Sequence, residues 1–468
     1  MSPSSRDLVE QHLDRIAAVD PLTRAVCTPD PTALSRADVL DREAAQGQVR
    51  GPLHGVPVLV KDNIDTADLA TTAGSLALAA AQPPAKDAEL VHRLRAAGLV
   101  VLGKTNLSEW ANFRDAESTS GWSAYGGLTR NPYGLNRSAG GSSSGSGAAV
   151  AARLARFAVG TETDGSIACP AAFNGCVGIK PTVGTVPTTG VVPISSSQDS
   201  PGPLAPTVRE AAALLTVLAG DGIDYAGSAV PGRLAGRRIG VPRRPWWGYS
   251  RHADAVGEEA LELLSGAGAE IVDDVDLGGL ATFGWDDELA VLMAEFRSEI
   301  TGYLASRAGE VPRTVEDLIA FNLAHADVEL AHFGQSVFES ALTVPGVESE
   351  EYAAARARCL EVSRTSGIDK ALTEHRLDGL LTPSYPPAWP IDLVNAEGDA
   401  GSCSQPTALA GYPLVTVPVR LAGGLPVGVS FWGTAGSERT LIELAAGLED
   451  ERDGALGPLP APTFPEFV

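Results

Sequence analysis

The sequence predicts an α/β fold in which helices cover both faces of a large mixed, mostly parallel sheet. Short apolar runs bounded by glycine, proline or charged residues recur along the 468 residues, and stretches with helical periodicity lie between many of them. A composition of 44% hydrophobic and 20% charged residues is that of a globular chain. One large sheet covered by helices is the simplest architecture with these properties.

The expected elements follow in chain order. The first is an amphipathic helix with Leu8, Leu13 and Ile16 on one side. Eight apolar runs are expected to be strands, at 56–60, 99–102, 157–160, 177–179, 239–241, 379–381, 414–419 and 427–431. Helical patterns separate many of them, at 88–97, 145–154, 208–219 and 255–266. Continuous helical periodicity at about 285–375 predicts a helical cap insertion. We expect a single domain over 1–468, with a catalytic core at about 50–210.

Charge and composition exclude several classes of function. With 35 basic and 58 acidic residues the net charge is −23, so a nucleic acid partner is not expected. The absence of a long apolar run and of a signal-peptide pattern predicts a cytoplasmic protein with no membrane partner. The seven histidines are scattered and no CxxC spacing occurs, so neither a metal nor a cofactor is expected. The five cysteines are expected to be free thiols: Cys27, Cys169, Cys176, Cys359 and Cys403.

Three polar segments stand out where chemistry is concerned. GPLHGVPVLVKDNIDT (51–66) brings Lys61 to the end of an apolar run, GGSSSGSG (140–147) opens a helical stretch, and GTETDGSIACPAAFNG (160–175) begins with a tight polar turn. Each alone is weak, since such turns are common before helices. Their joint order is informative.

Together the three segments resemble the amidase signature family of Ser-Ser-Lys amide hydrolases. The resemblance spans nearly the whole chain, including VGIKPTVG, GYPLVTVPV and GLPVGVSFWG. It implies the amidase signature fold, a nucleophilic Ser166, a bridging Ser142 in a cis peptide and a base, Lys61. The interval of 24 residues between the two serines matches the family spacing. Residues Ser143, Ser144 and Ser146 are then expected to cap or support the turn.

The physical chemistry of an amide hydrolase agrees with these roles. A serine hydroxyl needs a base to take its proton, and a lysine is a base only when neutral. Burial at a strand end lowers a lysine pKa, whereas Asp62 and Asp65 would oppose this if they faced it, so we expect them to point away. Two other lysines at strand ends, Lys104 and Lys180, lack a serine pair and are expected to be structural.

Amide hydrolysis also needs donors for the oxyanion. The backbone N–H groups of the turn Thr163, Asp164, Gly165 can converge on one point, and the resemblance implies the same oxyanion hole. The family pattern has glycine where Asp164 stands and arginine where Ala168 stands. Backbone donors tolerate the aspartate, while the missing arginine removes a positive charge from the edge of the site. Cys169 is expected to be a packed thiol rather than a nucleophile.

Further strings, SEWANFR, TETDGSIACPAA, PISSSQDSPGP and LIAFNLAHADVELAHFGQ, resemble the peptide amidase branch, which cleaves the C-terminal amide of peptides and releases ammonia. We expect a small-molecule or peptide amide substrate. Residues expected to tie down the turn are Ser197, Gln198 and Asp199. Candidate substrate contacts are Trp110, Asn112, Phe113 and Trp389, with Arg114, Trp122, Tyr385 and Asp392 as further wall residues.

Other functions stay open. An amidase-type component of a glutamine-dependent tRNA amidotransferase shares the motif, but a chain of charge −23 would have to take its RNA-binding surface from other components of such a complex. A general aryl or aliphatic amidase would use the same serine. A non-catalytic binding protein is the least attractive, because all three catalytic positions are filled. A homodimer is compatible with the sequence, which does not decide the oligomeric state.

Overall fold

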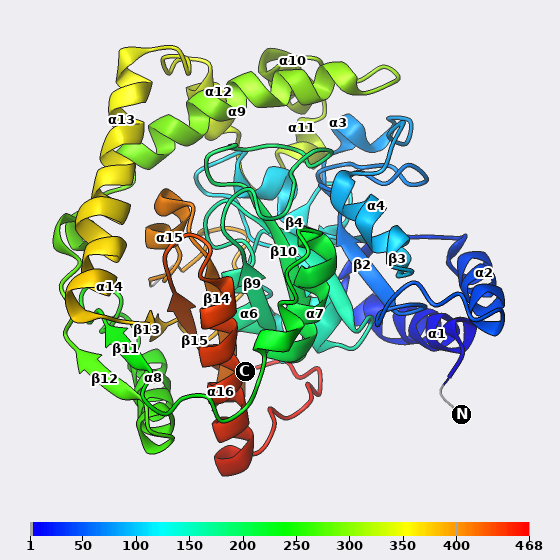
Figure 1. The fold of residues 1–468 in the computed structure, drawn as a ribbon. Coiled ribbons are helices and arrows are strands. Elements are labelled where there is room, and N and C mark those ends of the chain that lie inside the picture. The colour runs from blue at the N-terminus through cyan, green and yellow to red at the C-terminus, as the bar shows by residue number, and fades with distance from the viewer. Residues whose placement is uncertain (1–2, 399–400, 468) are drawn as a thin grey trace.

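A computed structural model describes residues 3–398 and 401–467 of the chain. At its centre is an 11-stranded sheet with the order β1-β3-β2-β8-β10-β9-β14-β15-β13-β11-β12 (Figure 1). Its strands are β1 (Val26–Pro29), β2 (Pro57–Lys61), β3 (Val100–Thr105), β8 (Phe157–Glu162), β9 (Val177–Lys180), β10 (Ser200–Ala205), β11 (Arg238–Val241), β12 (Glu270–Asp273), β13 (Gly379–Pro383), β14 (Leu414–Ala422) and β15 (Leu425–Trp432). Two small hairpins pair β4 (Trp122–Ser123) with β5 (Gly127–Leu128) and β6 (Arg130–Asn131) with β7 (Gly134–Ser138).

The sheet is mixed, as the sequence predicts, but it is not mostly parallel. Among its ten neighbouring pairs, four are parallel and six antiparallel. The difference arises because β10 runs antiparallel between β8 and β9, and because β14 and β15 form a hairpin closed by Gly423 and Gly424, both with positive φ. The sequence of β10, SPGPLA, contains two prolines and a glycine and therefore does not read as a strand.

Helices cover both faces of this sheet, as predicted (Figure 1). The helices are α1 (Ser5–Thr23), α2 (Ala33–Ala45), α3 (Leu76–Ala79), α4 (Glu89–Ala96), α5 (Ser144–Ala151), α6 (Ala168–Asn174), α7 (Val208–Ala219), α8 (Arg251–Gly266), α9 (Asp286–Ser306), α10 (Val315–Ala324), α11 (Ala326–Glu329), α12 (Ser336–Ala341), α13 (Glu350–Leu360), α14 (Asp369–His375), α15 (Gln405–Ala410) and α16 (Glu438–Leu456). Short 3-10 turns lie at Glu109–Asn112, Ala226–Ser228 and Gly278–Thr282, and a π-helix at Glu361–Ile368 joins α13 to α14.

Strand β2 shows how the apolar runs are used. Val58 and Val60 pack into the cluster formed with α4, α7, α8 and α16, whereas Leu59 packs into the cluster formed with α1, α2 and α5. Successive side chains of a strand point to opposite faces. A strand buried on both faces is therefore apolar throughout until its last residue, Lys61.

The segment from α9 to α14 is helical, and it lies along the top and left edge of the molecule in Figure 1. Its inner side forms a separate hydrophobic cluster in which Phe296 of α9 stacks on Phe338 of α12, with ring centroids 5.3 Å apart. The division of the chain into one domain with a core at about 50–210 and an insertion at about 285–375 stays a prediction.

Close helix packing brings the two serine-bearing segments together. A Cβ on Gly147 of α5 would lie 2.9 Å from the carbonyl oxygen of Pro170 in α6, so only glycine permits this approach. In the described part of the chain, none of the helices has both the length and the apolar character needed to span a membrane.

Candidate active site

Lys61, the last residue of β2, is fully buried and points at Ser142. Its Nζ lies 2.8 Å from Ser142 Oγ, 2.9 Å from Thr161 Oγ1 and 3.3 Å from Thr161 O. The peptide bond between Gly141 and Ser142 is cis, as the resemblance implies. A neutral amine can donate both hydrogens to Thr161 and accept the hydroxyl hydrogen of Ser142 through its lone pair.

Burial lowers the pKa of Lys61 to about 7, because the charged ammonium loses its hydration. The negative charges of Asp199 and Glu162 act in the opposite sense and are the smaller effect. Asp199 itself has a pKa raised by burial to about 6. A substantial fraction of Lys61 is therefore neutral near pH 7, which a general base requires.

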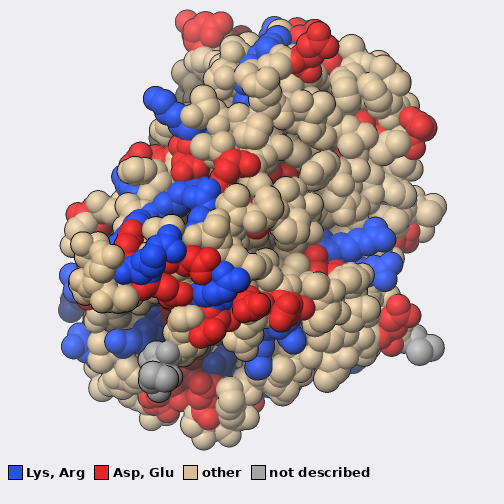
Figure 2. Space-filling view, turned by 90° about the vertical axis from the view of Figure 1, so that its right-hand side faces the viewer, with Lys and Arg blue, Asp and Glu red and all other residues tan. Residues whose placement is uncertain are grey.

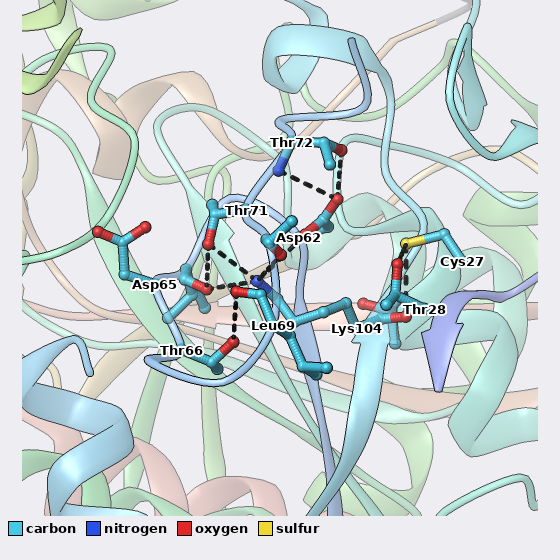
Figure 3. A network of polar contacts seen from close by, with 12 residues as sticks. Cys27, Thr28, Asp62, Asp65, Thr66, Leu69, Thr71, Thr72 and Lys104 are labelled. Atoms are coloured by element: carbon cyan, nitrogen blue, oxygen red, sulfur yellow. Dashed lines mark hydrogen bonds and ion pairs between the residues drawn. The ribbon is translucent and has the colours of Figure 1, made fainter. Parts of the chain in front are cut away.

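The two aspartates that follow Lys61 point away from it, as predicted, and Figure 3 shows both. Asp62 is fully buried and lies 3.1 Å from the ammonium of Lys104. Asp65 accepts a hydrogen bond from Tyr303 at 2.8 Å and lies 3.3 Å from Arg307, both in α9 and its C-terminal end. Neither carboxylate is among the charges that raise the pKa of Lys61.

The other two buried lysines make structural contacts, as predicted. Besides Asp62, Lys104 donates to Ile64 O at 2.7 Å and to Thr71 Oγ1 at 3.1 Å (Figure 3). Lys180 donates to the carbonyl of Tyr412 at 2.5 Å, and burial lowers its pKa to about 8. Each lysine thus holds a loop to a strand end.

The turn that carries Ser166 is held at both ends. Before it, Thr163 donates to Asp199 at 2.6 Å, and Asp199 also accepts the backbone N–H groups of Ile194 and Ser195. After it, the N–H groups of residues 167 and 168 donate to Glu162 at 2.7 and 2.8 Å. Gly165 has φ +76°, a conformation that glycine adopts without strain. This backbone path turns the chain sharply ahead of Ser166.

The remaining serines of the run connect the two segments. Ser143 donates its backbone N–H to Ser166 O at 3.1 Å, and its hydroxyl donates to Thr161 O at 3.0 Å. Ser146 donates to Val159 O at 3.1 Å, and the hydroxyls of Ser144 and Ser108 lie 3.5 Å apart. These contacts match the supporting role expected from the sequence.

A cavity of about 200 Å³ opens beside the turn. Two of the predicted substrate contacts, Asn112 and Trp389, line it together with Asp164 and Gly165. Sequence reasoning considered Tyr385 only as a wall residue and missed the others, which come from distant segments: Ser120, Gly141, Cys169, Trp285, Glu397, Ser402 and Ser404. Cys169 is a free, buried thiol here.

Two other predicted contacts lie elsewhere. Trp110 is 2% exposed and its ring packs edge-on against Phe338, with centroids 5.7 Å apart. Phe113 packs in the same way on Phe296 at 5.1 Å. Both side chains belong to the cluster beneath the helical insertion. The sequence shows aromatics before the bridging serine but not that α9 and α12 bury them.

Comparison with known proteins decides the family. The model of the family described as Amidase matches residues 7–442. The chain belongs to the amidase family. The amidase is similar to the solved structure of native peptide amidase from Stenotrophomonas maltophilia, with 45% identity, a TM-score of 0.90, and coverage of 99% of this chain and 96% of that one.

Two curated relatives are also similar to this amidase. A probable amidase of Arabidopsis thaliana is 37% identical over 95% of this chain and 86% of its own length. One of the glutamyl-tRNA(Gln) amidotransferase polypeptides, from Acidothermus cellulolyticus, is 36% identical over 97% of this chain and 93% of its own. The prediction of an amide hydrolase is confirmed at the level of the family.

The outer residues near the site have structural partners in this amidase. Arg114 is fully buried, forms ion pairs with Glu109 and Glu329, and lies over the rings of Trp122 and Phe333. Asp392 accepts backbone N–H groups of its own loop and is away from the cavity. Among the described residues no group of three or more His, Cys, Asp or Glu side chains is placed to hold a metal ion.

Proposed function

We propose that this amidase hydrolyses the C-terminal amide of peptides and releases ammonia, with Ser166 as nucleophile, Ser142 as proton bridge and Lys61 as base. The observation that carries the proposal is the buried amine of Lys61, 2.8 Å from Ser142 Oγ, beside the turn that presents Ser166. Its pKa of about 7 makes it a base near neutral pH.

In the first half-reaction Ser166 Oγ attacks the carboxamide carbon. Its proton passes to the hydroxyl of Ser142, which gives its own proton to the neutral amine of Lys61. When the tetrahedral intermediate collapses, the carbon–nitrogen bond breaks and the proton returns along the same route to the leaving nitrogen. The products of this step are ammonia and an ester of Ser166.

In the second half-reaction water takes the place of Ser166. Lys61 removes its proton through Ser142, the ester carbon is attacked, and the peptide acid leaves as Ser166 is reprotonated. The backbone N–H groups of Thr163, Asp164 and Gly165 are proposed to stabilise the oxyanion in both halves. Preorganised donors of this kind supply about 10²–10³ of the rate each.

The cavity supports a small leaving group and an aromatic-lined acyl site. Its walls include Trp285, Tyr385 and Trp389, and its volume of about 200 Å³ suits one residue rather than a long chain on each side. The similarity to a solved structure described as peptide amidase, at 45% identity over nearly the full length, favours peptide amides among carboxamides.

The surface charge argues against a role on tRNA by this chain alone. The net charge is −23, and Figure 2 shows basic and acidic side chains interleaved on the face formed by α1, α2 and α4. There Arg36 and Arg95 both pair with Asp68, and Arg50 pairs with Glu43. A basic stripe that follows a phosphate backbone is therefore missing from this face.

The test is an ammonia-release panel with C-terminally amidated peptides, simple aryl and aliphatic carboxamides, and glutamine. We expect the highest kcat/KM on the peptide amides and no release by the Ser166→Ala variant, which serves as blank. Glutamine as the best substrate, with release that depends on added partner proteins, would support the amidotransferase role instead. Full activity of Ser166→Ala would refute the proposed nucleophile.

A further inference from the structure

Glu288, in the first turn of α9, reaches the oxyanion turn from the helical insertion. It is fully buried, and each of its carboxyl oxygens accepts one amide hydrogen. Gln198 Nε2 donates to Oε1 at 2.9 Å and Gln405 Nε2 donates to Oε2 at 3.0 Å. Gln198 also donates to the carbonyl of Thr163 at 3.3 Å. Three segments far apart in sequence thus converge on one carboxylate.

Asp164 is the second acid of this cluster. It lies between Thr163 and Gly165 in the turn and lines the cavity, but both of its carboxyl oxygens are buried, and no donor among the described residues forms a well-aligned hydrogen bond with them. The polar groups that act on it are the carboxyl of Glu288 and the hydroxyl of Ser404.

Two neighbouring carboxyls in a water-poor site cannot both ionise at neutral pH. Burial, and then the charge of Glu288, raise the pKa of Asp164 well above its usual range, and burial raises that of Glu288. Both oxygens of Glu288 accept N–H groups, an arrangement that stabilises the ionised form. The proton of the pair therefore belongs on Asp164, the partner without aligned donors.

Other ionisable groups surround the pair without replacing that proton. Lys180 of β9 acts on Asp164, but its ammonium donates to Tyr412 O. The remaining neighbours are acids or thiols whose ionisation would add negative charge: Glu162 of β8, Tyr385 after β13, Cys403 before α15, and Cys359 of α13 beside Glu288.

We propose that Asp164 and Glu288 share one proton and act as a positioning pair that holds the oxyanion turn against α9. Loss of the proton places two negative charges beside the N–H groups that are proposed to receive the oxyanion, so kcat falls on the alkaline side. The inference rests on the proposed function for its kinetic consequence. The shared proton itself does not depend on the substrate.

Asp164→Asn is the deciding variant, because the amide keeps the size of the side chain and has no proton to lose in this range. We expect kcat at pH 7 to be largely unchanged and the alkaline limb of the pH profile to move to higher pH or vanish. Glu288→Gln places an amide against two amide donors, and we expect kcat to fall about 10- to 100-fold.

Glu295→Gln is the matched control. Glu295 lies two turns further along α9, is 3% exposed, and accepts hydrogen bonds from Ser195, Ser197 and Tyr352. Its loss should leave the position of the alkaline limb unchanged. Asp164→Gly, which removes the carboxyl, provides a second deciding variant if the asparagine protein fails to fold.

Infrared difference spectroscopy without substrate tests the proton directly. The spectrum of wild type minus Asp164→Asn should contain the C=O band of a protonated carboxylic acid at neutral pH, and this band should disappear at alkaline pH. A missing band, or a wild-type alkaline limb in Asp164→Asn, would overturn the proposal. Wild-type protein inactive on every amide, with the band present, would refute the proposed function and leave the shared proton intact.

Discussion

At the scale of single residues, the proposed chemistry depends on how Lys61 is surrounded. Its amine has Ser142 and Thr161 as hydrogen-bonding partners and no carboxylate in direct contact, since Asp62 pairs with Lys104 and Asp65 with Arg307. Burial then determines the direction of the pKa shift. The sign is downward, so the neutral form, and with it the proposed activity, is lost as the pH falls.

The first prediction is a pH–rate profile. In the wild type kcat/KM for a peptide amide should rise as the pH passes through about 7, the pKa of Lys61. Lys61→Arg should lose about 10²–10⁴ of the rate at every pH below 10, because a guanidinium stays charged. Ammonia release in overlapping buffers measures both. A wild-type rate that is flat from pH 8 down to about pH 5 would contradict a lysine base.

The second prediction concerns Gly165. A Cβ here would collide with the hydroxyl of Tyr385 and lie 3.0 Å from Ser404 Oγ, in a backbone with φ +76°. We expect Gly165→Ala to lower kcat by about 10²–10³, the effect of losing one aligned donor. The control is Gly184→Ala, where φ is +88° and no atom lies within 4 Å of the new Cβ. It should cost roughly 1–2 kcal/mol of stability and leave kcat unchanged. Equal effects of both substitutions on kcat would argue against a role in alignment.

At the scale of elements, the ends of two parallel strands place the site. Lys61 ends β2 and pairs in register with Thr105 of β3, and the next residue, Asp62, meets Lys104 across the same edge. The loop that follows β2 folds back over this pair, since Thr72 donates to Asp62 and Lys104 donates to Thr71. A buried ion pair thus fixes the loop beside the proposed base.

The third prediction is that Lys104→Met lowers the free energy of unfolding by about 3–5 kcal/mol, because it leaves Asp62 buried without its partner. Adding Asp62→Asn should restore part of the loss. Urea unfolding measures both. As control, Arg6→Met breaks an exposed ion pair with Asp38, 44% and 40% exposed, and should cost at most about 1 kcal/mol. Additive losses in the double variant would mean that the two buried charges do not interact.

At the scale of the whole molecule, the net charge of −23 acts on charged substrates. On one face acidic and basic side chains are paired, so that short-range contacts there are largely neutralised (Figure 2). The excess negative charge remains as a long-range field. Such a field changes encounter rates and is screened within about 10 Å at 0.1 M salt.

The fourth prediction follows from that field. Raising the ionic strength should lower kcat/KM for cationic peptide amides, raise it for anionic ones, and leave a neutral peptide amide unchanged. Initial rates at substrate concentrations well below KM measure this directly. A response to salt that is the same for all three peptides would show that long-range charge plays no part in substrate capture.

The local patterns of the sequence determine the strand and helix types. The eight apolar runs are strands because each is buried on both faces, and the alternating helices follow from 3.6-residue periodicity. Strand direction was not readable, because an apolar run has the same composition whichever way it runs. Strand β10 was missed because SPGPLA lacks a strand pattern and is a strand only through its pairing with β8 and β9.

The sequence by itself also determined the order of Lys61, Ser142 and Ser166 and the glycines that let their segments approach. Only the tertiary structure decided which distant side chains share the cavity. Trp110 was drawn into a core by Phe338, whereas Trp285, Glu397 and Ser404 reached the cavity from segments far from the motifs. Glu288 meets Asp164 for the same reason: contacts between residues more than a hundred positions apart depend on how helices dock on the sheet, and no local pattern records that.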